Sequence, residues 1–207
     1  DGWTFKPYPG STVDHLYNSN YLYELYLRAN KNYSGRVTVP ILWDKKLETI
    51  VNNESSEIIR MFNSEFNQIT NNFDDYYPES RRKEIDELNH FTYHNINNAV
   101  YKAGFASSKE AYEDAYENLF KALDKLEQIL GDRKYLLGEE ITEADWRVFP
   151  TLIRFDAIYY SHFKCNKKRI IDYPNLHRLI KDLYNFKSVK ETVATDQSKI
   201  HYFGSHK

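Results

Sequence analysis

The sequence lacks a second cysteine that could pair with Cys165, so an internal disulfide is excluded and the thiol fits a reducing compartment. No apolar run approaches the roughly 18 residues of a membrane-spanning helix, and there is no signal-peptide pattern. The formal net charge of −2 gives no electrostatic footprint for nucleic acid or an anionic membrane surface. We therefore expect a soluble, cytoplasmic protein with no nucleic-acid partner and no membrane partner.

Patterns for metal and phosphate binding are also lacking. The sequence has no glycine-rich phosphate-binding loop, internal repeat or low-complexity segment. Among its seven histidines, His90 and His94 stand four residues apart, as two ligands on one helix face would. No HExxH glutamate accompanies them and no third ligand is evident, so a helix surface or a packed position is the better interpretation. We predict no metal site.

The composition is that of an ordinary globular protein, with 41% hydrophobic and 28% charged residues among 207. This length suits one large domain or two small ones with a buried core. The pattern changes along the chain from short strands and helices to helices alone. We predict a partial α/β domain over residues 1–67, a linker rich in Asn and Asp over residues 68–78, and an all-helical domain over residues 79–207.

Residues 35–66 organise the first domain. Val37, Val39 and Ile41 alternate with other residues, which predicts a strand, and Pro40 marks an edge, a strand start or a cis bond. We predict that the Val39–Pro40 bond is cis. Residues 49–51 form a second short strand, and a helix opens within residues 52–57. Free backbone groups beside the proline and at the helix start can together hold a small peptide carboxylate.

The second domain is predicted to contain helices over residues 79–103, 107–130, 142–160 and 174–186, followed by an irregular tail. Ser107 and Glu110 form a capping box for the second of these helices, and Thr142 and Asp145 form one for the third. Pro150 lies too deep in the third helix to be a first-turn proline. We expect a kink or a local break there.

The amino-acid sequences of seven segments resemble those of a known family. Residues 35–66 resemble the glutathione-site half of a thioredoxin-like domain. The whole chain resembles the Xi class of glutathione transferases, the S-glutathionyl-hydroquinone reductases. The segments that carry the resemblance occur in one order from the first residue to the last: DGWTF, SGRVTVPILWD, NNESSEIIRMFN, NAVYKAGFA, ITEADWR, HFKCN and HYFGSHK.

The resemblance implies a glutathione site in a partial thioredoxin-like domain. A valine and a cis-proline pair with the tripeptide backbone, a Glu-Ser pair at a helix start takes its γ-glutamyl end, and an indole covers it. The residues that match these roles, with a basic residue beside them, are Trp3, Arg36, Val39, Pro40, Glu54 and Ser55. Without the family, Trp3 would be interpreted as a surface anchor.

In the family a Cys-Pro-Trp-Ala motif supplies the nucleophile, and this sequence does not contain it. We expect that cysteine upstream, because the chain begins abruptly with Asp1 and suggests a fragment or a processed protein. Cys165 is a poor substitute, since it lies in the helical domain, far in sequence from the proline. Nearby lysines such as Lys164 could lower its pKa, but a structural thiol is the better interpretation.

Three of the eighteen tyrosines match catalytic positions of the family: Tyr101, Tyr159 and Tyr202. The resemblance makes Tyr101 the proton donor and acceptor, and the other two stabilisers of a thiolate. A phenol stays protonated at pH 7, so it can hydrogen-bond an anionic sulfur or protonate a leaving group. Taken singly, each tyrosine would be interpreted as a packing residue. We predict that their hydroxyls point into one cavity that faces the Val39–Glu54 site.

The resemblance therefore predicts a glutathione-dependent thiol transferase that reduces glutathionyl-hydroquinones, with glutathione as co-substrate and no metal. It also implies a homodimer and a quinol-type aromatic substrate. Two alternatives stay open. One is an omega-like transferase, which the tyrosine motifs disfavour. The other is a non-catalytic module that binds glutathione or serves as a helical interaction domain.

Overall fold

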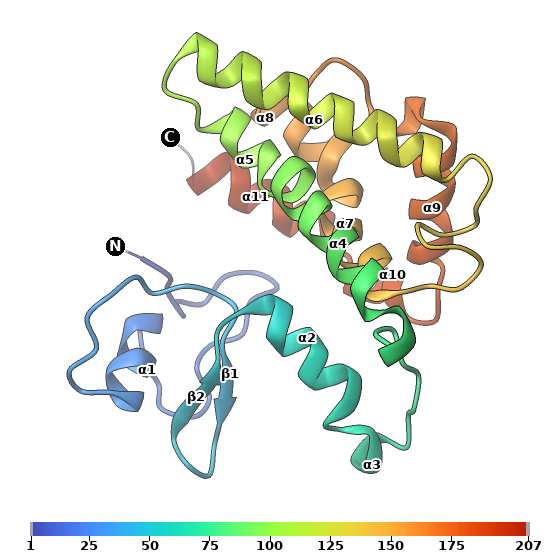
Figure 1. Ribbon diagram of the computed structural model, residues 1–207. Coiled ribbons are helices and arrows are strands. Elements are labelled where there is room, and N and C mark those ends of the chain that lie inside the picture. Colours follow the sequence, from blue (N-terminus) through green and yellow to red (C-terminus); the bar gives the residue numbers. More distant parts are fainter. Residues whose placement is uncertain (1, 206–207) are drawn as a thin grey trace. The chain divides into compact units, whose positions relative to one another are not determined.

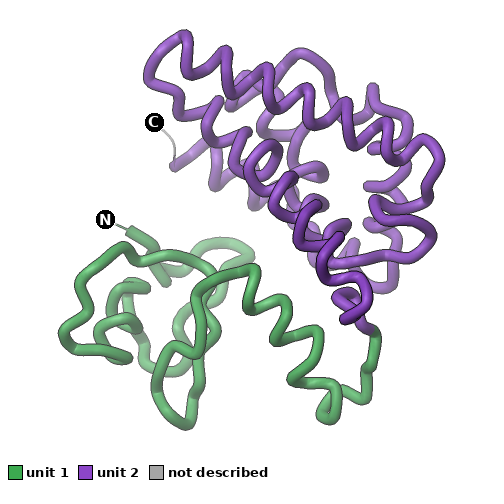
Figure 2. The backbone as a smooth tube through the Cα atoms, in the orientation of Figure 1, with its two compact units in different colours: residues 1–74 green, residues 75–207 purple. Residues whose placement is uncertain are grey.

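The computed structural model describes residues 2–205, so Asp1, His206 and Lys207, at the ends of the first and last quoted segments, lie outside the described residues. The chain divides into two compact units, residues 1–74 and residues 75–207 (Figure 2). The first combines helices with a small sheet, and the described part of the second is helical (Figure 1). The predicted fold class, an α/β piece followed by an all-helical domain, is confirmed.

The first unit is built around one hairpin and three helices. Strands β1 (Leu42–Asp44) and β2 (Thr49–Asn52) pair antiparallel, with Trp43 opposite Ile50. Helix α1 (Leu22–Ala29) precedes them, and α2 (Ser55–Ser64) and α3 (Asn67–Thr70) follow. The buried core here is small and consists mainly of Leu22, Leu25 and Tyr26 of α1.

The prediction of a strand at residues 37–41 is wrong, because β1 begins only at Leu42. A strand needs a neighbour for its backbone groups, and among the described residues β1 and β2 form a sheet of two strands. Side chains take over part of that role. The Tyr26 hydroxyl donates to the carbonyl of Thr38 at 2.9 Å, and the Tyr33 hydroxyl donates to that of Arg36 at 2.7 Å.

In the second unit, the region predicted as one helix over residues 79–103 consists of several helical pieces. A 3₁₀ turn (Glu79–Arg81) leads into α4 (Arg82–Thr92), a π-helical turn (Tyr93–Asn97) follows, and α5 (Ala99–Gly104) ends it. Helix α6 (Lys109–Ile129) packs against α5. Its N-cap is Ser108, whose hydroxyl accepts from the amide of Ala111 at 3.1 Å, so the predicted capping box of Ser107 and Glu110 is wrong by one residue.

The capping box predicted at Thr142 is confirmed at the start of α7 (Glu143–Arg154). One carboxylate oxygen of Asp145 accepts from the amide and the hydroxyl of Thr142, at 2.9 and 3.1 Å. The other accepts from the amide of Leu136 at 2.9 Å. Asp145 is fully buried, so this one side chain ties the helix start to the loop before it.

No break occurs at Pro150, because α7 continues through it to Arg154 and then enters a second π-helical turn (Phe155–Tyr159). A short α8 (Tyr160–His162), a 3₁₀ turn (Ile170–Asp172) and α9 (Pro174–Tyr184) follow. The prediction of an irregular tail is wrong: α10 (Val189–Thr192) and α11 (Thr195–Ser205) occupy it. The described residues contain no helix that combines the length and apolarity needed to span a membrane.

Candidate functional site

The predicted cis bond is present between Val39 and Pro40. Side chains hold this bond beside the start of α2. The side-chain amide of Asn53 donates to the hydroxyls of both Tyr26 and Thr38, at 3.3 Å each. The backbone amide of Thr38 donates to the Tyr26 hydroxyl, also at 3.3 Å. Since Thr38 precedes Val39 and Asn53 precedes Glu54, this network draws the two predicted binding segments together.

The start of α2 leaves its outer face open. Glu54 is the N-cap and makes no side-chain cap bond, while its amide donates to the Asn52 side chain at 2.7 Å. The side chains of Glu54 and Ser55 are exposed, as is Val39 at 47%. The first amides of a helix have no intrahelical partner, so this end can accept an anionic group.

The backbone carbonyls of Trp3 and Arg36 are hydrogen-bonded to residues in or near α1. The carbonyl of Trp3 accepts from the amide of Leu22 at 3.0 Å, and the side chain is 43% exposed. The carbonyl of Arg36 accepts from Tyr33, whose ring packs 4.8 Å from that of Tyr26, centroid to centroid. Tyr26, Tyr33, Thr38 and Asn53 were missed by sequence reasoning, because polar contacts between distant residues leave no periodic signal.

In the second unit the three predicted tyrosines meet. Tyr101 comes from α5, Tyr159 from the second π-helical turn and Tyr202 from α11. The hydroxyl oxygens of Tyr159 and Tyr202 lie 3.0 Å apart and those of Tyr101 and Tyr159 lie 3.4 Å apart, and Tyr101 and Tyr202 are directly hydrogen-bonded. The predicted convergence of the hydroxyls is therefore observed, while the catalytic roles of the three tyrosines stay a prediction.

The pKa values of two of these phenols are raised above that of an ordinary tyrosine. Burial raises the pKa of Tyr101 to about 12, and hydrogen bonding to Tyr202 acts in the same direction. Burial, reinforced by hydrogen bonds to the other two hydroxyls, also raises the pKa of Tyr159. These groups are therefore proton and hydrogen-bond donors at neutral pH, rather than phenolates.

The two π-helical turns help to aim the phenols. The amide of Asn98 donates to the carbonyl of Tyr93, five residues back, and the amide of Tyr160 donates to that of Phe155. Such a turn accommodates one residue more than an α-helical turn, and each residue turns an α-helix by about 100°. The turns therefore set the direction in which Tyr101 and Tyr159 leave their helices.

Gly104 lets a ring approach the same cluster. A Cβ at this position would overlap the side chain of Phe163, which is buried and only 2% exposed. The Phe163 ring lies 5.5 Å from the rings of both Tyr101 and Tyr159, centroid to centroid. Gly104 and Phe163 both stand in quoted segments, which is the signal that could have identified them.

Cys165 is fully buried, and burial raises the pKa of its thiol to about 12. The suggestion that neighbouring lysines lower this pKa is therefore wrong, and the structural interpretation of the thiol holds. The rings of His90 and His94 lie close together, with centroids 4.4 Å apart and planes tilted by 59°. Within residues 2–205, no cluster of three or more His, Cys, Asp or Glu side chains could hold a metal ion.

Comparison with known proteins places these features in context. Residues 109–182 match the family described as "Glutathione S-transferase, C-terminal domain". All of the chain aligns with two curated relatives. It is 54% identical to the glutathionyl-hydroquinone reductase YqjG of Escherichia coli K12 and 51% identical to the glutathionyl-hydroquinone reductase PcpF of Sphingobium chlorophenolicum. It spans 63% and 66% of their respective lengths.

Solved structures agree with these sequence matches. The glutathione-bound structure of YqjG superimposes with a TM-score of 0.97 and covers 99% of this chain, which spans 67% of that one. The crystal structure of the glutathione-S-transferase Xi from Phanerochaete chrysosporium is 50% identical, with a TM-score of 0.95. It covers 99% of this chain, and 72% of its own chain is matched.

Proposed function

The chain belongs to the Xi class of glutathione transferases, and from this premise we propose that it takes part in the glutathione-dependent reduction of glutathionyl-hydroquinones. The observation that carries the proposal is the meeting of three phenolic hydroxyls, from α5, the second π-helical turn and α11. A cluster of protonated phenols is suited to an aromatic substrate and an anionic sulfur.

In the proposed reaction, a cysteine thiolate attacks the sulfur of the glutathionyl-hydroquinone. A sulfur–sulfur bond forms, the bond between sulfur and the ring carbon breaks, and that carbon takes a proton from Tyr101. A second glutathione then attacks the mixed disulfide, which releases oxidised glutathione and restores the cysteine thiolate, while the thiol proton of this glutathione returns to Tyr101. The net change consumes one glutathione and one substrate and yields the hydroquinone and glutathione disulfide.

The phenols contribute through hydrogen bonds. Three hydroxyls carry three donors, and their oxygens lie within hydrogen-bond distance of one another. An anionic sulfur beside the cluster would draw hydrogen bonds from Tyr159 and Tyr202, because bonds to a charged acceptor are stronger than neutral ones. Tyr101 would then be free to deliver its proton to the departing ring.

Glutathione binding is assigned to the first unit. Val39, beside cis-Pro40, would pair with the tripeptide backbone, and Glu54 and Ser55 would take its γ-glutamyl end at the start of α2. Trp3 would cover the bound molecule and Arg36 would supply a positive charge. The exposure of these side chains, and the Tyr26–Thr38–Asn53 network behind them, support this assignment.

We assign the nucleophile to a cysteine outside residues 1–207. A thiolate is the reactive form of cysteine, and Cys165 is buried, with its pKa raised to about 12. The same observation supports the alternative that this chain alone is a non-catalytic glutathione-binding module. A homodimer and a cytoplasmic location, where reduced glutathione is available, complete the proposal; sedimentation of the purified chain tests the first.

A thiol-exchange assay with a glutathionyl-hydroquinone tests the function. The chain would be compared with a protein in which a thioredoxin-like segment bearing Cys-Pro-Trp-Ala precedes residue 1. We expect turnover from the longer protein and none from the chain alone. Replacing the added cysteine by serine provides the control. Turnover that survives this replacement would contradict the proposed chemistry, and absence of turnover from the longer protein would favour the non-catalytic module.

A further inference from the structure

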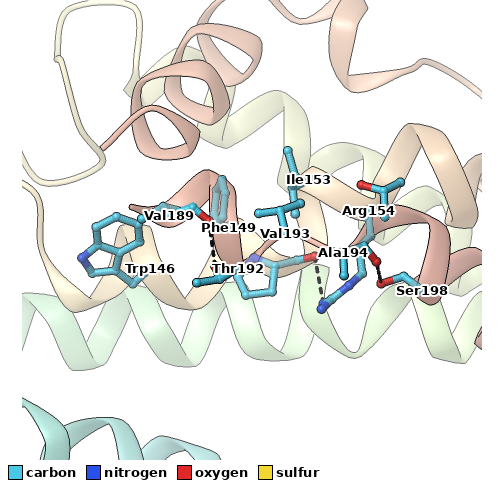
Figure 3. Close-up of a pocket in the computed structure, with 11 residues that line it drawn as sticks. Trp146, Phe149, Ile153, Arg154, Val189, Thr192, Val193, Ala194 and Ser198 are labelled. Atoms are coloured by element: carbon cyan, nitrogen blue, oxygen red, sulfur yellow. Dashed lines mark hydrogen bonds between the residues drawn. The ribbon is translucent and has the colours of Figure 1, made fainter. Parts of the chain in front are cut away.

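The second unit contains a cavity of about 290 Å³ between α7 and the segment that joins α10 to α11 (Figure 3). None of the three phenols lines it. Its lining consists of one face of α7 together with residues from α10, α11 and their junction: Trp146, Phe149, Pro150, Ile153, Arg154, Val189, Thr192, Val193, Ala194, Thr195 and Ser198. The groups proposed to carry out the reaction thus leave this cavity unexplained.

The lining has two different ends. Trp146 stands at one end, Arg154 and Ser198 stand at the other, and Phe149, Ile153, Val189 and Val193 lie between them (Figure 3). The middle is therefore largely apolar and partly aromatic, with Thr192 beside it, whereas the guanidinium of Arg154 and the hydroxyl of Ser198 stand at one end. A ligand with an apolar body and one polar head would match this arrangement.

The charge at the polar end is positive. The half-buried Arg154 guanidinium donates to the carbonyl of Pro150 at 3.2 Å. The ion pairs recorded among residues 2–205 include no carboxylate partner for it. A positive charge that is partly removed from water and has no counter-ion favours an anionic ligand. Asp196, in the first turn of α11, is exposed and does not line the cavity.

A carboxylate is an anion that fits this guanidinium. A planar carboxylate matches the guanidinium fork with two parallel hydrogen bonds. The ring walls at Trp146 and Phe149 add favourable contact for a flat apolar body. The volume lies near the roughly 300 Å³ lower end of ligand pockets, which limits the ligand to about one or two rings.

We propose that this cavity binds a small aromatic monocarboxylate, with its ring against Phe149 and Val193 and its carboxylate on Arg154. None of the residues assigned to glutathione binding lines the cavity. The proposal for this cavity does not depend on the proposed reductase reaction. If the cavity binds no such ligand, the proposed reductase reaction still stands.

Binding of 1-naphthoate to the chain, followed by calorimetry, tests the site, with the neutral 1-naphthamide as matched ligand. We expect Arg154→Gln to weaken 1-naphthoate binding about tenfold or more, because a charge-assisted bond is lost. The same variant should leave the weaker naphthamide binding unchanged. Lys190→Gln also removes one positive charge, from neighbouring α10, but Lys190 does not line the cavity. This variant should leave the affinity for 1-naphthoate unchanged.

The place of binding is checked by NMR of the three tryptophan indole N–H groups. The Trp146 signal should shift on addition of 1-naphthoate, while those of Trp3 and Trp43 should not. Val193→Phe should fill the cavity and abolish the shift in a protein whose thermal unfolding stays cooperative. Equal affinity for acid and amide, an unaffected Arg154→Gln variant, or no binding at millimolar ligand would each overturn the proposal.

Discussion

At the scale of single residues, Ser55 and Ser56 form a natural pair at the start of α2. Ser55 is exposed, whereas Ser56 is half-buried. In a protein completed by a thioredoxin-like segment, Ser55→Ala should weaken glutathione binding more than Ser56→Ala. A lost hydrogen bond to the γ-glutamyl carboxylate is worth roughly 1.5–3 kcal/mol. Calorimetry measures both affinities, and equal values for the two variants would argue against the assignment of Ser55.

Tyr101 offers a kinetic prediction in the same completed protein. Tyr101→Phe should slow hydroquinone release by roughly a hundredfold or more, the usual contribution of a positioned general acid. Its glutathione affinity should stay nearly unchanged. Single-turnover kinetics measures the first quantity and calorimetry the second. Tyr93→Phe is the matched control, since this phenol is 44% exposed and is not one of the three hydroxyls that meet; a comparable loss there would discredit the role of Tyr101.

The sequence identified these site residues unevenly. Tyr101, Tyr159 and Tyr202 are separated by dozens of positions, so no sequence periodicity or motif spacing links them. They were identified only because the sequences of whole segments resemble the family. The Tyr26–Thr38–Asn53 network was missed for the same physical reason. Its hydrogen bonds join residues 12 to 27 positions apart, and nothing local in the sequence marks either partner.

At the scale of elements, Gly104 and Gly204 provide a matched test of packing at the ends of α5 and α11. Gly104→Ala should lower the free energy of unfolding by about 1–3 kcal/mol, because the added methyl overlaps the buried Phe163 ring. Gly204→Ala meets nothing within 4 Å and should be neutral or stabilising by up to about 1 kcal/mol. Urea unfolding measures both changes. Equal effects would contradict the close approach of Phe163.

Elements were predictable where their cause is local. Helix α9 begins with Pro174 and buries Leu176, Leu179 and Leu183 at helical spacing, as its sequence predicts. Helix α11 lacks such a stripe, because Ile200 and Phe203 are about half exposed, and it was therefore mistaken for irregular chain. The false strand at residues 37–41 has the right alternation, but pairing depends on a partner that alternation cannot reveal.

At the scale of the whole molecule, the two units differ in how completely they bury their apolar side chains. The core of the second unit runs through α5, α6, α7 and α9, and all its buried members lie within residues 75–207. The first unit buries a few side chains, while Phe62 of α2 is 56% exposed and Leu47 of the hairpin is 71% exposed. The larger unit thus holds most of the apolar burial that stabilises a fold.

Residues 75–207 should therefore fold on their own, and residues 1–74 should not. We expect cooperative thermal unfolding and dispersed NMR signals from the larger fragment. The smaller one should bind a hydrophobic dye and unfold without a sharp transition, because a chain this short with little burial is marginal. Circular dichroism of both fragments, purified separately, measures this. A cooperative transition in residues 1–74 would show that its small core suffices.

In evolutionary terms, the two π-helical turns make length, rather than residue identity, the constrained property of their segments. Substitutions at exposed positions such as His94 leave the backbone count intact. Loss of a single residue from Tyr93–Asn97, or from the part of Phe155–Tyr159 before Tyr159, would restore α-helical bonding and swing the phenol of Tyr101 or Tyr159 by about 100° around its helix. Descendants that keep all three phenols should therefore align without gaps across both segments, and lineages that have lost a residue there should have lost the phenol's role as well.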